Sequence, residues 1–111
     1  MLTVAACGSS SSHSSTTALL GNTVHQECTA ISDVLADGPD PDADPVGYAQ
    51  AQVLPLRQLT ISDAKLHSDV LTLANAFQAF STGSGAGGTK AALAVAKAEN
   101  AVNSICPEAA P

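Results

Sequence analysis

"LHSDVLTLANAFQAF", residues 66–80, is the most regular stretch of this chain. Its apolar residues recur at steps of four and three, so they share one face of an α-helix. They are Leu66, Val70, Leu73, Phe77 and Phe80. Ser62, just before the stretch, is suited to cap the first turn. The stretch therefore predicts an amphipathic helix that buries this stripe, and no segment alternates with the period of two that a strand requires.

Three further segments show the same spacing, and each predicts a helix. They are residues 24–35, 46–60 and 91–105. Proline affects two of them, because its ring removes a backbone donor and cannot continue a helix. Pro107 is expected to stop the last segment, while Pro55 is expected to bend or split the helix of residues 46–60.

Four amphipathic helices with short connections predict an all-α fold, a small antiparallel four-helix bundle of up-down-up-down topology. We expect this bundle to span residues 18–107, with residues 108–111 as a C-terminal tail. Antiparallel pairing of the last two helices sets Phe80 opposite Ala91, a large residue against a small one, as a close-packed core requires. A domain of this size buries a small core, so a covalent staple is expected.

Cysteine supplies the candidate for that staple. In the expected topology the first and last helices are adjacent and antiparallel, which brings the early part of one beside the late part of the other. Cys28 is early in the first helix and Cys106 closes the last, so we predict a disulfide between them. The chain has three cysteines, and Cys7 is then left over, which in an exported protein needs its own explanation.

The residues around Cys7 suggest that explanation. The stretch "VAAC", residues 4–7, resembles the lipobox of bacterial lipoproteins, in which small residues precede the cysteine that receives a diacylglyceryl group. The resemblance implies a lipid on Cys7 and attachment to the cell membrane on its extracytoplasmic side. Residues 1–6 would be the remnant of a signal peptide, with residues 7–17 forming the lipidated cysteine and a flexible, disordered, Ser-rich tether.

Two properties of the sequence extend this interpretation. A secretory signal needs a basic and an apolar region before its cleavage site, so the true start of the protein is expected upstream of Met1. The many alanines and few lysines are similar to the composition of lipoproteins from actinobacteria. No stretch approaches the roughly 18 consecutive apolar residues of a membrane-spanning helix.

Composition and motifs argue against several classes of function. The formal net charge is −6 with four Lys and Arg residues, so a nucleic-acid partner is not expected. Residues 83–88 fit the G-x-G-x-x-G pattern, but they follow a helix instead of a strand and are interpreted as a linker. The chain has neither a G-x-S-x-G elbow nor a C-x-x-C pair. We therefore expect no enzyme activity and no cofactor.

Two polar clusters are candidates for metal binding. The spacing of the aspartates in residues 37–44 resembles the start of a calcium loop, but the later glycine and glutamate are absent, so a solvated turn is expected. His25 and His67 begin the first and third helices, which run parallel in the expected bundle and share one end. With Glu27 or Asp63 nearby, these histidines could form a weak zinc or copper site.

Four apolar residues fall beside the core stripes, where they either broaden the core or leave an exposed patch that would bind a partner. They are Leu54, Leu59, Ile61 and Leu93. The leading hypothesis is a small cell-envelope lipoprotein whose bundle acts by binding or scaffolding, with another envelope protein as the partner. The alternative is a carrier of a small ligand or metal ion at the His25/His67 end.

Overall fold

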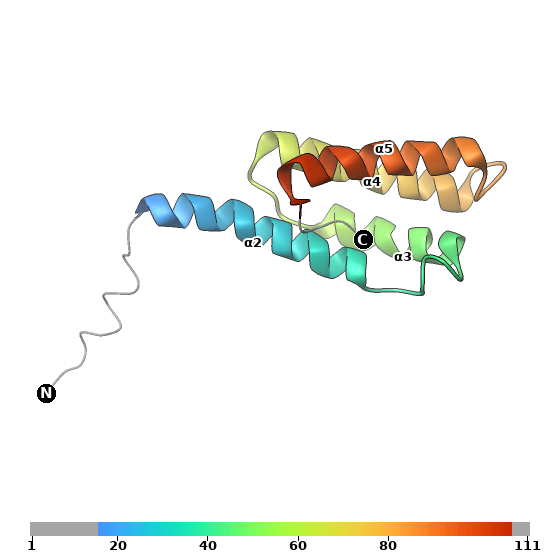
Figure 1. Ribbon diagram of the computed structural model, residues 1–111, viewed down its shortest axis with the longest axis horizontal. Coiled ribbons are helices and arrows are strands. Elements are labelled where there is room, and N and C mark those ends of the chain that lie inside the picture. Colours follow the sequence, from blue (N-terminus) through green and yellow to red (C-terminus); the bar gives the residue numbers. More distant parts are fainter. Residues whose placement is uncertain (1–15, 108–111) are drawn as a thin grey trace, which may run out of the picture.

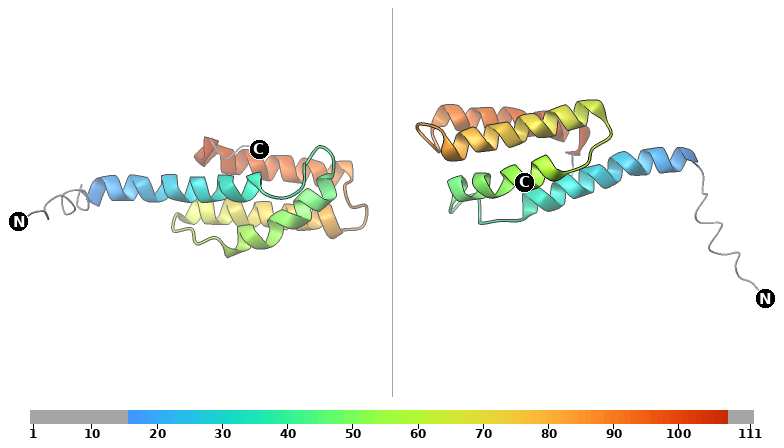
Figure 2. Two further views of the ribbon diagram at one scale, coloured as in Figure 1. Left: turned by 90° about the horizontal axis from the view of Figure 1, so that it is seen from below. Right: turned by 180° about the vertical axis from the view of Figure 1, so that it is seen from behind.

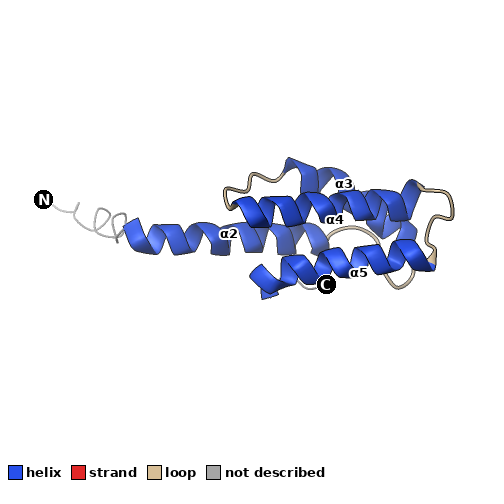
Figure 3. Ribbon diagram, turned by 90° about the horizontal axis from the view of Figure 1, so that it is seen from above, coloured by secondary structure: helices blue, strands red, loops and turns tan. Residues whose placement is uncertain are grey.

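The structure is a computed structural model that describes residues 16–107, with side chains from residue 23 onward. This part of the chain contains four α-helices and no strand, as Figure 3 shows, so the all-α prediction is confirmed. The helices are α2 (Thr16–Ala36), α3 (Pro45–Gln58), α4 (Ala64–Thr82) and α5 (Thr89–Ile105).

The helices are arranged in two layers. α4 and α5 lie side by side in one layer, and α2 and α3 form the other (Figures 1 and 2). Successive helices point in opposite directions along the molecule (Figure 1). The most extensive packing joins α4 to α3 and to α5, whereas α2 overlaps the other helices only over its C-terminal part (Figure 1).

The stripe predicted in residues 66–80 is the centre of the core. All five of its apolar side chains are buried, and the other three helices contribute residues to the same cluster. Of the four apolar residues beside the stripes, Leu59 and Ile61 pack against the core. Leu54 and Leu93 are 62% and 66% exposed, on α3 and α5 respectively.

Three local features differ from the sequence-based expectations. α2 begins at Thr16, eight residues before the first expected core position at Val24. α3 continues through Pro55, which is exposed, so of the two effects expected of this proline the split does not occur. α4 begins one residue later than expected, since Asp63 is its N-cap.

The change of cap at α4 has a tertiary cause. The Asp63 carboxylate accepts a hydrogen bond from the backbone N–H of Leu66 at 2.9 Å, which satisfies a free donor of the first turn. Ser62 instead faces α2, where its backbone N–H and its hydroxyl both donate to Glu27 Oε2, at 2.8 and 2.9 Å. The serine therefore joins the α3–α4 connection to α2.

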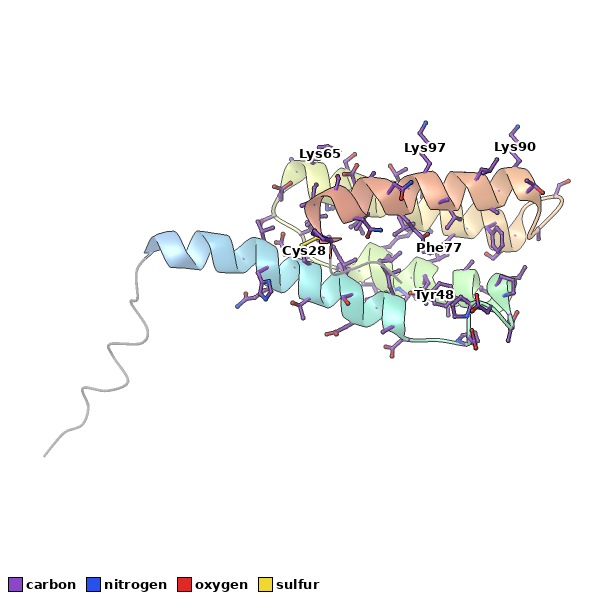
Figure 4. The ribbon with its side chains drawn as sticks, viewed as in Figure 1. Cys28, Tyr48, Lys65, Phe77, Lys90 and Lys97 are labelled. Carbon is purple, nitrogen blue, oxygen red and sulfur yellow. A yellow bond between two sulfur atoms is a disulfide. The ribbon has the colours of Figure 1, made fainter. Side chains whose placement is uncertain are left out.

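The two cysteines of the bundle meet where the middle of α2 lies beside the end of α5. The sulfur atoms of Cys28 and Cys106 are 2.04 Å apart, which is disulfide distance, and the Cα atoms are 5.3 Å apart (Figure 4). Both side chains are buried. The pair joins residues separated by 78 positions, so a bond here closes most of the folded chain into one loop.

We expect reduction to lower the stability of the bundle strongly. Loop entropy sets an upper estimate of about 4.5 kcal/mol for a bond of this span, and measured disulfides typically give about 2–4 kcal/mol. In a domain of this size that corresponds to a fall in Tm of roughly 10–30 °C. The measurement is thermal unfolding with and without reductant in a Cys7→Ser background, together with peptide mapping of the non-reduced protein.

The matched control is a Cys28→Ser/Cys106→Ser variant in the same background, whose Tm should not respond to reductant. Alkylation of both thiols in the folded, oxidised protein would contradict the predicted bond.

Candidate functional site: a groove beyond the end of α2

The candidate site lies where α2 ends and the other three helices continue. Leu35 is the last α2 residue in the core, and α2 ends at Ala36 (Figure 1). Beyond that point no helix of the described chain fills the fourth position of the bundle, and residues 37–44 cross it as a loop (Figures 1 and 2). A cavity of about 420 Å³ opens there between α3, α4, α5 and this loop. We refer to it as the groove.

Aromatic and small apolar side chains line the groove. α3 contributes Tyr48 and Ala49, and α4 contributes Phe77 and Phe80. The rings of Tyr48 and Phe77 are packed edge to face, with centroids 5.9 Å apart and an interplanar angle of 81°. Val95 of α5 completes this apolar surface, which is continuous with the core of the bundle.

Two side chains of α3 hold the end of α2 in place. The Tyr48 hydroxyl donates a 2.5 Å hydrogen bond to the carbonyl of Leu35. Gln52 Nε2 donates to the carbonyl of Asp37 at 2.8 Å. The last carbonyls of a helix lack partners within the helix, and the Tyr48 bond satisfies one of them, that of Leu35. The Gln52 bond holds the first residue after α2. Tyr48 therefore fixes the boundary of the groove as well as forming part of its lining.

The rim of the groove is acidic. Glu99 of α5 lies on one side, half-buried, and Asp42 of the loop lies on the other. Within the described residues, the Glu99 carboxylate has neither a hydrogen-bond donor nor an ion-pair partner. Burial raises the pKa of Glu99 above its ordinary value, because a carboxylate loses hydration in these surroundings.

No basic side chain of the described chain compensates for these carboxylates. Arg57 donates to the side chains of Asn75 and Gln78, on α4, and Lys65 pairs with Asp69 at 2.8 Å. Lys90 and Lys97 project from the far side of α5, away from Tyr48 and Phe77 (Figure 4). None of these cations lines the groove. The site thus combines an aromatic interior with two carboxylates and no neighbouring positive charge.

The histidines predicted to bind metal do not line the groove. His25 lies in the middle of α2 instead of at its start, because the helix begins at Thr16, and its side chain is exposed. His67 is exposed on the first turn of α4. Glu27 and Asp63 are engaged with the α3–α4 connection and the α4 cap.

Across the residues that the structure describes, no group of three or more His, Cys, Asp or Glu side chains is placed to hold a metal ion. The aspartates of residues 37–44 form a turn. Asp40 accepts from the backbone of Asp42 at 2.8 Å, and Asp44 caps α3 through the N–H of Gly47 at 3.0 Å. A Cβ on Gly47 would stand 2.2 Å from the Asp44 carboxylate, so a larger residue here would push the Asp44 side chain out of its capping position.

The lipobox-like residues 4–7 and the segment that follows them up to residue 15 lie outside the described residues. Within residues 16–107, none of the helices combines the length and the apolar character needed to span a membrane. Comparisons with protein-family models, with curated proteins and with solved structures found no match for this chain.

We expect Tyr48 to make stability pH-dependent in the alkaline range. Burial, and to a lesser extent the charge of Glu99, raise the pKa of Tyr48 from 10.0 to about 12. The folded state therefore retains the phenol proton longer than the unfolded state, so the stabilisation is complete below pH 10 and is lost as the pH rises towards 12. Tyr48 is the only tyrosine, so absorbance at 295 nm follows its ionisation directly.

The control is Tyr48→Phe, which keeps the ring but removes the bond to Leu35. This variant should lose about 1 kcal/mol at neutral pH and show a smaller further loss than the native chain between pH 10 and 12. A titration midpoint at the ordinary value of 10 in the folded protein would contradict the buried, hydrogen-bonded position of Tyr48.

Proposed function

We propose that this chain is a small cell-envelope lipoprotein whose antiparallel four-helix bundle, stapled by a Cys28–Cys106 disulfide, acts by binding a ligand in the groove. The observation that carries the proposal is the groove itself. Its volume of about 420 Å³ lies within the range of about 300–1,000 Å³ usual for small-molecule sites. Its lining is mainly apolar and aromatic, with a few polar groups at the rim, as in such sites.

The direction of α2 supports display of the groove away from the membrane. The N-terminal turns of α2 project from one end of the bundle, and the groove lies towards the opposite end (Figures 1 and 2). The 21 residues of α2 span about 31 Å at 1.5 Å per residue. An anchor attached before α2 would therefore leave the groove facing outward, accessible to a soluble ligand.

The pairing of Cys28 with Cys106 also supports the anchor, because it accounts for two of the three cysteines and leaves Cys7 for another role. Binding in the groove needs no catalytic group, and we propose a binding protein instead of an enzyme. No observation in the structure favours metal carriage at the His25/His67 end.

We expect the groove to bind a neutral apolar dye, N-phenyl-1-naphthylamine, with an increase in the fluorescence of the dye when it is excited directly. Ala92 is an exposed residue of α5 that lines the groove, so Ala92→Trp fills the groove without disturbing the core. This variant should bind the dye at least about tenfold more weakly than the native chain.

Ala94→Trp is the matched control, because Ala94 is exposed on the same helix but does not line the groove. It should bind the dye as the native chain does, and both variants should retain the native helical circular dichroism. Equal binding by the native chain and Ala92→Trp would show that the groove is not the binding site.

We expect the anchor to depend on Cys7. Expressed in a bacterium behind an intact export signal, the protein should enter the detergent phase of Triton X-114, because two or more acyl chains give stable membrane attachment. Cys7→Ala should remain in the aqueous phase. An aqueous distribution of the native protein after its export has been verified would contradict lipidation.

A further inference from the structure

The electrostatics of the groove indicate what its ligand must carry. Glu99 presents a half-buried carboxylate without a hydrogen-bond donor or a cation among the described residues, and Asp42 of the loop also lines the groove. A ligand that covers this surface removes more water from Glu99. Burying an ionised carboxylate is costly unless a positive charge or several donors replace the lost water.

This requirement separates the classes of apolar ligand. An anionic ligand would meet two carboxylates and no basic side chain within the described structure, so it would be repelled. A neutral apolar ligand would further desolvate Glu99 without compensating its charge. A cationic ligand would pair with Glu99 through a charge-assisted hydrogen bond, while its apolar part would lie against the aromatic lining.

The loop across the groove favours a small molecule over a peptide helix. Residues 37–44 cross the position that α2 leaves open, and Pro41 and Asp42 of this loop line the groove. A partner helix laid in that position would have to displace the loop, which the Gln52 bond to Asp37 helps to hold.

We infer that the groove binds a small amphiphilic cation, with an apolar body against Tyr48, Phe77 and Phe80 and an ammonium group paired with Glu99. This inference rests on the proposed function, since it names the ligand class of the same groove. The formal net charge of −6 would also favour the approach of such a cation.

The test compares three ligands with the same eight-carbon chain and different head groups: octylammonium, 1-octanol and octanoate. Binding to the full 111-residue chain is measured by calorimetry and by the fluorescence of Tyr48, since the chain has one tyrosine and no tryptophan. Octylammonium should bind at least about tenfold more tightly than 1-octanol, and octanoate should bind more weakly than both.

Glu99→Gln removes the charge and keeps the shape of the side chain. It should bring the affinity for octylammonium to within about twofold of that for 1-octanol, which should not weaken, because a neutral ligand no longer desolvates a charge at this position. Asp33→Asn is the control, because it removes the same charge from an exposed position on α2 outside the groove. This control should keep most of the preference for octylammonium.

Lowering the pH should also reduce the preference for the ammonium head group. Burial raises the pKa of Glu99, so protonation begins at a higher pH than for an exposed carboxyl. Asp42 and Tyr48 are the other titratable groups that line the groove, and Tyr48 stays protonated throughout this range. The loss of preference on acidification should be absent from Glu99→Gln.

The other outcomes decide between the two proposals. Equal binding of octanoate and octylammonium, or a preference that survives Glu99→Gln, would overturn the ammonium inference while leaving the groove as a binding site. If the dye binds and Ala92→Trp abolishes that binding, but no octyl ligand binds, the ammonium inference is also overturned. The groove then remains a binding site. If neither the dye nor any octyl ligand binds the native chain, the proposed function itself fails.

Discussion

The apolar stripe of α4 is the constraint on which the rest of the structure depends. Its buried side chains extend from Leu66 to Phe80 and must be covered from several directions, since exposed aromatic and aliphatic surface is unfavourable. α3 and α5 cover α4 along its length, but α2 ends beside its middle (Figure 1). The groove is the part of this core surface that α2 does not reach.

The position of α2 is fixed at both ends of its packed segment. At the early end, Cys28 meets Cys106 of α5, and Glu27 accepts two hydrogen bonds from the α3–α4 connection. At the late end, Tyr48 and Gln52 bind the carbonyls of Leu35 and Asp37. Because these contacts lie about two turns apart along α2, shifting the helix towards the groove would break both sets at once.

The sequence predicts the four helices and the buried stripe of residues 66–80 because their periodicity is a local property. Sequence-based prediction fails where a tertiary contact decides the local structure. Ser62 and Asp63 are both suitable caps, and only the engagement of Ser62 with α2 leaves the cap to Asp63. The burial of Tyr48 and Gln52 is not predicted from the sequence, since their side chains bond to carbonyls at and just after the end of α2. The groove also depends on where α2 ends, so the periodicity of the sequence does not predict it.

The composition of the groove is not explained by folding alone. A small domain has little stability to spare, yet this one places an unpaired, half-buried carboxylate of Glu99 against aromatic surface. Glutamine at the same position would keep the shape without the cost of desolvating a charge. A group that lowers stability inside an otherwise well-packed core is expected where the position also serves a function. At this groove, the positively charged ligand that we propose would account for a carboxylate beside an apolar lining.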